Sequence, residues 1–178
     1  MMRWHFWQMS LRKQTLEADW SQIGNNYLVE FYSDSSELFG TVAAFLSDSF
    51  KDGKAGIVIA TKEHLRGIEE ALSTRGLDPL TLQKRGLYIP LDAKDTLERF
   101  LVNDRPDRGR FLEAVGALVS RASMSCGGVR AFSEMAAALW RRGNNAGAIA
   151  LESFWDDMVK AYPLNVILRL SEGRLHCR

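Results

Sequence analysis

The sequence has few of the residues that usually mark a metal or redox centre. Its 178 residues include only two cysteines and three histidines. Cys126 and Cys177 form neither a CxxC pair nor a zinc-ligand spacing. We therefore expect two free thiols in a reducing compartment, with no metal site and no cofactor.

Long apolar runs and an excess of one charge are also missing. Lys and Arg number 23 against 22 Asp and Glu, a formal net charge of +1, which argues against nucleic-acid binding. No window approaches the roughly 20 apolar residues of a membrane span. The first residues, MMRWHFWQMSLRKQ, are too aromatic and too briefly apolar for a secretory signal. The sequence predicts a cytoplasmic protein.

Short apolar runs alternate with amphipathic segments along most of the chain. The runs predict strands, and the segments between them predict helices. Alternation of this kind favours an α/β fold, a three-layer sandwich with a mostly parallel sheet of about five strands and helices on both faces. The expected strands are 27–32, 55–61, 86–92, 128–133 and 164–170.

The helical segments follow from apolar stripes at helical spacing. We expect them near 38–50, 62–76, 93–102 and 110–123, followed by a helical pair that Gly143 separates; residues 103–109 read as a loop. Residues 27–178 are predicted to form one domain. Residues 1–26 read as an aromatic arm, with Trp4, Trp7 and Trp20, and a homodimer through residues 1–20 is an open alternative.

Polar residues finish four of the expected strands. In a parallel sheet the carboxyl ends of strands share one edge, where ligands bind. The residues at this edge are Tyr32 and Asp34, then Thr61, Asp92 and Glu134. Asp34, Thr61 and Asp92 are equally suited to cap the helices that follow. Glu134 fits a cap less well, and an ion pair with an arginine such as Arg130 is its alternative.

Two further positions stand out in the predicted helical pair. Glu152 lies among apolar residues, so its carboxyl is expected to be half-buried and to need a partner. Trp140 and Trp155 are more typical of a core than of a ligand site. His64 falls in the first turn of a predicted helix, where a histidine is usually solvated.

The turn after the first strand lacks the residues that bind phosphate. A phosphate-binding loop needs glycines and a lysine, whereas YSDSSELFG (32–40) has no lysine and carries Asp34 where the anion would lie. GxGxxG is missing as well. These absences disfavour nucleotide hydrolysis of the usual kind.

Several motifs together resemble the MEDS domain, the sensory domain of bacterial and archaeal regulators of one-carbon and simple hydrocarbon metabolism. They are VEFYSDSSEL, GIVIATKEHLRGIEEAL, LDAKDTLERFLVNDRPD, VRAFSEMAAALW and ALESFWDDM, and the resemblance covers about residues 25–165. It implies a RecA/KaiC-like sandwich that has lost its phosphate loop. The residues matching the family's characteristic positions are Tyr32, Asp34, Asp92, Arg130, Glu134, Trp140, Glu152 and Trp155. The chain departs from the family at Tyr27, at Ser133 and in its last strand.

The resemblance implies a non-catalytic sensory module. Such a module would bind a small organic ligand at the strand ends, through residues that include Thr61, and act on a partner such as a histidine kinase or anti-sigma-type protein. Two alternatives are an enzyme relic, nucleotide-binding or hydrolytic, that uses Glu134 as a base, and a dimeric scaffold without a ligand.

Overall fold

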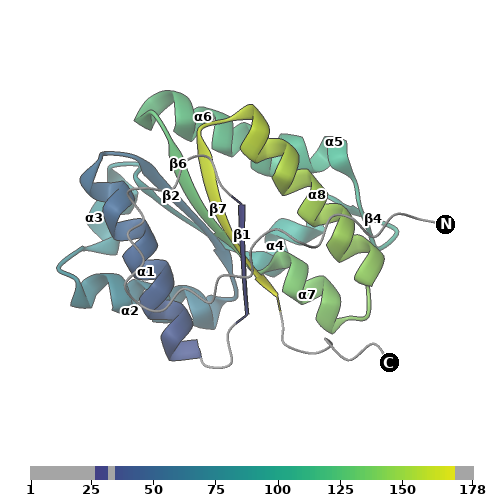
Figure 1. Cartoon of the computed structure of the whole chain (residues 1–178), viewed down its shortest axis with the longest axis horizontal. Coiled ribbons are helices and arrows are strands. Elements are labelled where there is room, and N and C mark those ends of the chain that lie inside the picture. The colour runs from purple at the N-terminus through teal and green to yellow at the C-terminus, as the bar shows by residue number, and fades with distance from the viewer. Residues whose placement is uncertain (1–26, 32–34, 171–178) are drawn as a thin grey trace.

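Five parallel strands form the central sheet of the computed structural model, which describes residues 27–31 and 35–170 (Figure 1). The strands are β1 (Tyr27–Phe31), β2 (Ala55–Ala60), β3 (Tyr88–Asp92), β6 (Val129–Ser133) and β7 (Leu164–Leu170). Their order across the sheet is β1-β7-β6-β2-β3, and every pairing is parallel. The predicted five-stranded parallel sheet is confirmed.

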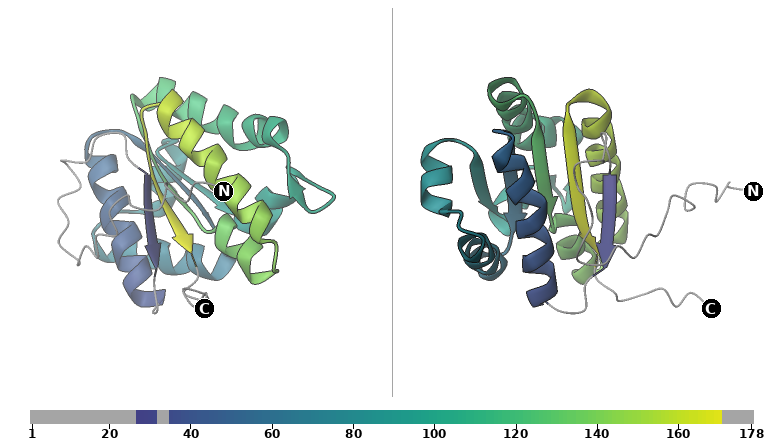
Figure 2. Two further views of the ribbon diagram at one scale, coloured as in Figure 1. Left: turned by 45° about the vertical axis from the view of Figure 1, so that its right-hand side comes forward. Right: turned by 60° about the vertical axis from the view of Figure 1, so that its left-hand side comes forward.

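Helices cover both faces of the sheet, which confirms the three-layer sandwich (Figures 1 and 2). One face carries α1 (Ser35–Lys51), α2 (Lys62–Thr74) and α3 (Pro79–Lys84). The other carries α4 (Ala93–Glu98), α5 (Arg108–Phe111), a π-helical turn (Leu112–Gly116), α6 (Ala117–Cys126), α7 (Met135–Arg141) and α8 (Asn145–Ala161). Among the described residues, no helix is long and apolar enough to cross a membrane.

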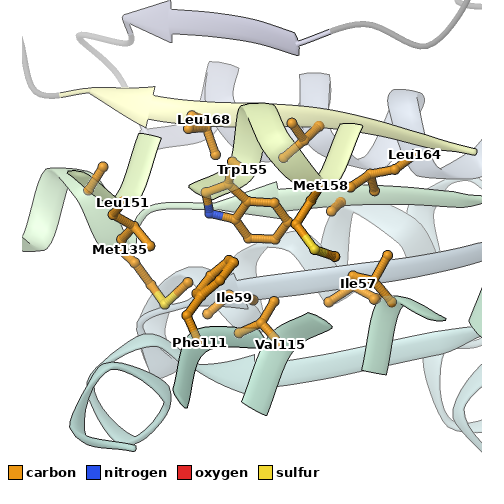
Figure 3. Close-up of a cluster of buried hydrophobic side chains, with 14 of the residues drawn as sticks. Ile57, Ile59, Phe111, Val115, Met135, Leu151, Trp155, Met158, Leu164 and Leu168 are labelled. Atoms are coloured by element: carbon orange, nitrogen blue, oxygen red, sulfur yellow. The ribbon is translucent and has the colours of Figure 1, made fainter. Parts of the chain in front are cut away.

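Strand alternation divides the core into two clusters. Ile57 and Ile59 of β2 face the α4–α8 layer, whereas Val58 and Ala60 face α1–α3, because successive strand side chains point to opposite faces. Trp155 fills the centre of the first cluster, against Phe111 and between strands and helices (Figure 3). Trp155 is thus a core residue, as its apolar surroundings in the sequence indicate.

The predicted helix over 93–102 is too long. The α4 helix ends at Glu98, and Leu101–Val102 (β4) pairs with Arg105–Pro106 (β5) in an antiparallel hairpin. Asn103 and Asp104 form its two-residue turn with φ of +50° and +60°, a conformation that Asn and Asp tolerate better than most residues. The predicted loop over 103–109 is therefore partly this hairpin.

Two helical details were not predicted. Asp78 caps the short helix α3, accepting from the Leu80 and Thr81 amides, and Pro79 occupies its first turn. The predicted helix over 110–123 is extended in both directions and contains the π-helical turn. The aromatic arm predicted over residues 1–26 lies outside the described residues.

Candidate functional site

The carboxyl ends of β2, β6 and β7 bring three charged or titratable side chains together. These three strands are neighbours in the sheet. His64 lies in the first turn of α2, directly after β2; Glu134 follows β6; and Arg169 is near the end of β7. We define these three residues as the edge cluster.

Glu134 is the centre of the edge cluster. Its side chain has no solvent exposure, and both carboxylate oxygens accept hydrogen bonds. Oε1 accepts from the Thr61 amide at 2.5 Å, and Oε2 lies 2.6 Å from His64 Nδ1 and 3.3 Å from Arg169 Nη1. A buried carboxylate requires such partners. These contacts come from the start of α2 (Thr61 and His64) and from β7 (Arg169), so Glu134 ties these two parts of the sheet edge together.

Burial alone would raise the pKa of Glu134. Hydrogen bonds from His64 and the Thr61 amide, together with the charge of Arg169, outweigh the burial and hold this pKa below its ordinary value. Glu134 is therefore an anion at neutral pH, with both oxygens already engaged.

The 2.6 Å contact to Glu134 assigns a proton to His64 Nδ1, because a carboxylate oxygen can only accept. Arg169 Nη1, 3.0 Å from the same nitrogen, is then a close neighbour of it and donates to Glu134 instead. In the neutral imidazole, Nε2 is then left as an acceptor. The His64 and Arg169 side chains are 13% and 18% exposed, so the edge cluster reaches solvent through these two groups. With His64 neutral, Glu134 and Arg169 cancel in charge.

An aromatic ring from α1 packs against His64. The Phe39 and His64 rings meet edge to face, with centroids 5.4 Å apart. Phe39 also lies so close to Gly67 of α2 that a Cβ there would clash with its ring. Gly67 thus permits the close approach of α1 and α2 that holds the imidazole ring in place.

Thr61 and Asp92 both cap helices, the alternative considered from sequence. Thr61 Oγ1 accepts from the His64 amide at 3.3 Å, and an Asp92 carboxylate oxygen accepts from the Asp95 amide at 3.0 Å. Thr61 joins the edge cluster through its own amide. Asp92 pairs in register with Ala60 at the same edge, but its side chain is engaged in capping.

Arg130 does not pair with Glu134. It donates to the Phe45 carbonyl and lies over the Phe45 ring, 5.0 Å from the centroid. Arg130 and Glu134 are four residues apart, and four residues of strand span about 13 Å, so their closeness in sequence does not bring the two charges into contact. The arginine that pairs with Glu134 is Arg169.

Trp140 and Glu152 form a second pair, on α7 and α8. Burial raises the pKa of Glu152 to about 7, and a hydrogen bond from the Trp140 side chain partly opposes this rise. Within the described ranges, neither residue forms a hydrogen bond or an ion pair with the edge cluster. Tyr32 and Asp34 lie outside the described residues.

Sequence reasoning missed His64 and Arg169. His64 comes three residues after the capping Thr61, which places its backbone at the strand end, but the partner 70 residues away is invisible in the sequence. Arg169 is the one charge in the apolar run LNVILRL, and a charge in a buried strand calls for a partner. No group of three His, Cys, Asp or Glu suited to a metal occurs in the part of the chain that the structure describes.

Comparison with solved structures shows the fold. The chain is similar to the KaiC-like protein PH0186 from the hyperthermophilic archaeon Pyrococcus horikoshii OT3, with a TM-score of 0.57 and 13% sequence identity. The match covers 86% of this chain and 66% of that one, so the chain spans about two thirds of that structure. This similarity shows a RecA/KaiC-like α/β sandwich.

A family model identifies the chain more closely. The model of the MEDS domain, described as the methanogen/methylotroph, DcmR sensory domain, matches residues 28–167. The chain therefore belongs to the MEDS family of sensory domains, and the resemblance seen in its motifs is confirmed. No curated protein matches the chain.

Proposed function

We propose that this chain is a non-catalytic, cytoplasmic sensory module that binds a small, neutral organic molecule at the carboxyl edge of the sheet. Residues 27–178 would form the sensory domain, and binding would be passed to a partner signalling protein, such as a histidine kinase or an anti-sigma-type protein. Membership of the MEDS family supports the sensory role.

The edge cluster carries the proposal about the ligand. Glu134 is buried with both oxygens engaged, so it serves to hold His64 and Arg169 in place. The groups left for a ligand are His64 Nε2 and the exposed part of the Arg169 guanidinium. Because the charges of Glu134 and Arg169 cancel, the cluster favours a neutral guest over an anionic one.

A thermal-shift panel of small neutral organic compounds, small carboxylates and nucleotides tests this proposal. A ligand that binds only the folded chain raises the melting temperature by mass action. We expect a rise with at least one neutral compound, its loss in His64→Ala, and its retention in Glu63→Ala. Glu63 is the exposed neighbour of His64 on α2 and serves as the matched control.

A larger shift with a nucleoside triphosphate than with any neutral compound would overturn the choice of ligand. No shift with any compound, together with a concentration-dependent dimer that is lost on deletion of residues 1–20, would favour the dimeric scaffold.

The edge cluster also favours one alternative, a hydrolytic enzyme. A histidine whose Nδ1 is held by a buried carboxylate presents Nε2 as a general base. His64 would then be the base and Glu134 the positioning residue, rather than Glu134 the base itself. Turnover of small chromogenic esters that is lost in His64→Ala, with folding intact, would support this alternative over the sensor.

A further inference from the structure

Exposed arginines gather around the β4–β5 hairpin and the turn between α7 and α8. Residues 99–110 and 141–142 contain six arginines and no lysine, all of them exposed: Arg99, Arg105, Arg108, Arg110, Arg141 and Arg142. With two aspartates, these segments carry a net charge of +4. Because the whole chain is +1, the remaining residues carry −3. These segments are therefore more positive than the rest of the chain taken together.

Direct contacts hold these segments together as one surface. Asn144 donates from Nδ2 to the Asp104 carbonyl at the hairpin tip and accepts from the Gly147 amide at 2.8 Å, which fixes the start of α8. Arg108 pairs with Asp157 of α8 at 3.0 Å. Figure 2 shows the hairpin projecting outward on the side of α7 and α8. We call this region the arginine surface.

Exposed apolar side chains lie on the same elements. Among the described residues, five large hydrophobic side chains are exposed, and three of them are Val102 of β4, Leu112 after α5 and Ile149 of α8, at 37%, 36% and 55%. Arginine combined with exposed apolar side chains is typical of protein–protein interfaces. Surfaces that bind nucleic acid are more polar than protein–protein interfaces, so the exposed apolar side chains favour a protein partner.

We propose that the arginine surface docks an acidic, amphipathic segment of a partner protein. Arginine favours this occupant over a simple counterion, because its planar guanidinium can bind a carboxylate through two hydrogen bonds. The apolar side chains would meet the hydrophobic residues of the same segment. The inference rests on the proposed function only in supposing that a partner exists.

Fluorescence anisotropy with the full chain tests the surface without any ligand at His64. The probes are a labelled peptide of Glu and Leu, a Lys and Leu peptide of equal length, a duplex DNA and vesicles containing phosphatidylserine. The test variant is Arg141→Glu/Arg142→Glu. The matched control is Arg75→Glu/Arg85→Glu, which reverses two exposed arginines at the ends of α2 and α3.

We expect the acidic peptide to bind the wild type and the control variant, and to bind the test variant about tenfold more weakly or not at all. If the Glu variant folds poorly, Arg141→Gln/Arg142→Gln replaces it. This variant removes the two charges without reversing them, so we expect an intermediate loss of peptide affinity. Equal weakening in the control and test variants, or no binding to the wild type, would overturn the proposal. Tighter binding of DNA or vesicles than of the acidic peptide would overturn the choice of a protein partner. Failure here leaves the thermal-shift result on His64 unaffected, so the two proposals can fail separately.

Discussion

Glu134 is buried and Glu152 is partly buried, and their pKa values shift in opposite directions. Glu134 accepts hydrogen bonds from an amide and from His64 and lies beside Arg169, and its pKa falls. Glu152 has a hydrogen bond from Trp140, and its pKa rises to about 7. The partners of a carboxyl, more than its burial, decide whether it is ionised.

This difference separates two regions of the molecule. At the edge cluster an anion and a cation are fixed together, which makes a preorganised polar site. Between α7 and α8, a partly buried carboxyl without a cationic partner among the described residues has a pKa of about 7, so its charge responds to pH. Replacing each group in turn tests this contrast.

The largest effect is expected for Glu134→Ala. The substitution leaves the Thr61 amide without its acceptor and leaves Arg169 without its counter-charge. Removing one member of a buried ion pair typically costs several kcal/mol, so we expect a loss of about 3 kcal/mol in the free energy of unfolding at pH 7. Urea denaturation measures it, with Glu63→Ala as the control, which should change stability by less than about 0.5 kcal/mol. A loss below that same level for Glu134→Ala would contradict the central role of this carboxylate.

A smaller effect is expected for Glu134→Gln, on the loss of stability at acidic pH. The folded pKa of Glu134 lies below the ordinary value of 4.5, so its contribution is fully present above about pH 4.5 and is lost as the pH falls through the folded value. Glu134→Gln should therefore flatten the decline of stability below pH 4.5. Urea midpoints measured from pH 3 to 7 check this, and a decline as steep as in the wild type would count against it.

The fold was largely readable from the sequence because strand and helix patterns are local. The five apolar runs became the five strands of the sheet, and Thr61 and Asp92 cap helices as their positions indicate. Only one of the three residues of the edge cluster could be predicted from the sequence. Glu134 was selected by its strand-end position, but its partners His64 and Arg169 are distant in sequence, and only strand order makes them neighbours.

The lack of long-range information in the sequence also explains why Arg130, rather than Arg169, was suggested as the partner of Glu134. The sequence shows Arg130 four residues before Glu134, but it does not show that the Phe45 carbonyl of α1 accepts from the guanidinium. The short hairpin was missed because its strands are two residues each, too short for an alternating pattern to appear.

Glu152→Gln is expected to increase the free energy of unfolding above neutral pH, whereas Glu134→Ala decreases it. Because the folded pKa of Glu152 is raised to about 7, the stability of the wild type falls as the pH rises from about 4.5 to 7. The glutamine variant lacks this fall and should be more stable than the wild type at pH 8, by about 1 kcal/mol once screening of the partly exposed carboxyl by solvent is allowed for. Thermal unfolding at pH 5 and pH 8 measures the difference. A variant equally destabilised at both pH values would show that the carboxyl is needed for packing instead.

The smallest expected effect is that of Trp140→Phe on the titration of Glu152. The hydrogen bond from the Trp140 side chain lowers the pKa of this carboxyl against the effect of burial. Phenylalanine keeps an aromatic ring at this position but has no N–H to donate, so the pKa of Glu152 should rise above about 7. Carboxyl-carbon NMR across pH 5 to 9 follows this single group. Ser153→Ala, at the exposed neighbouring position on α8, should leave the titration unchanged. If Trp140→Phe lowers the pKa of Glu152, water has entered and burial is the stronger influence on this carboxyl. If the pKa rises, the Trp140 N–H stabilises the ionised form of Glu152 in the wild type, as the hydrogen bonds from His64 and Arg169 do for Glu134.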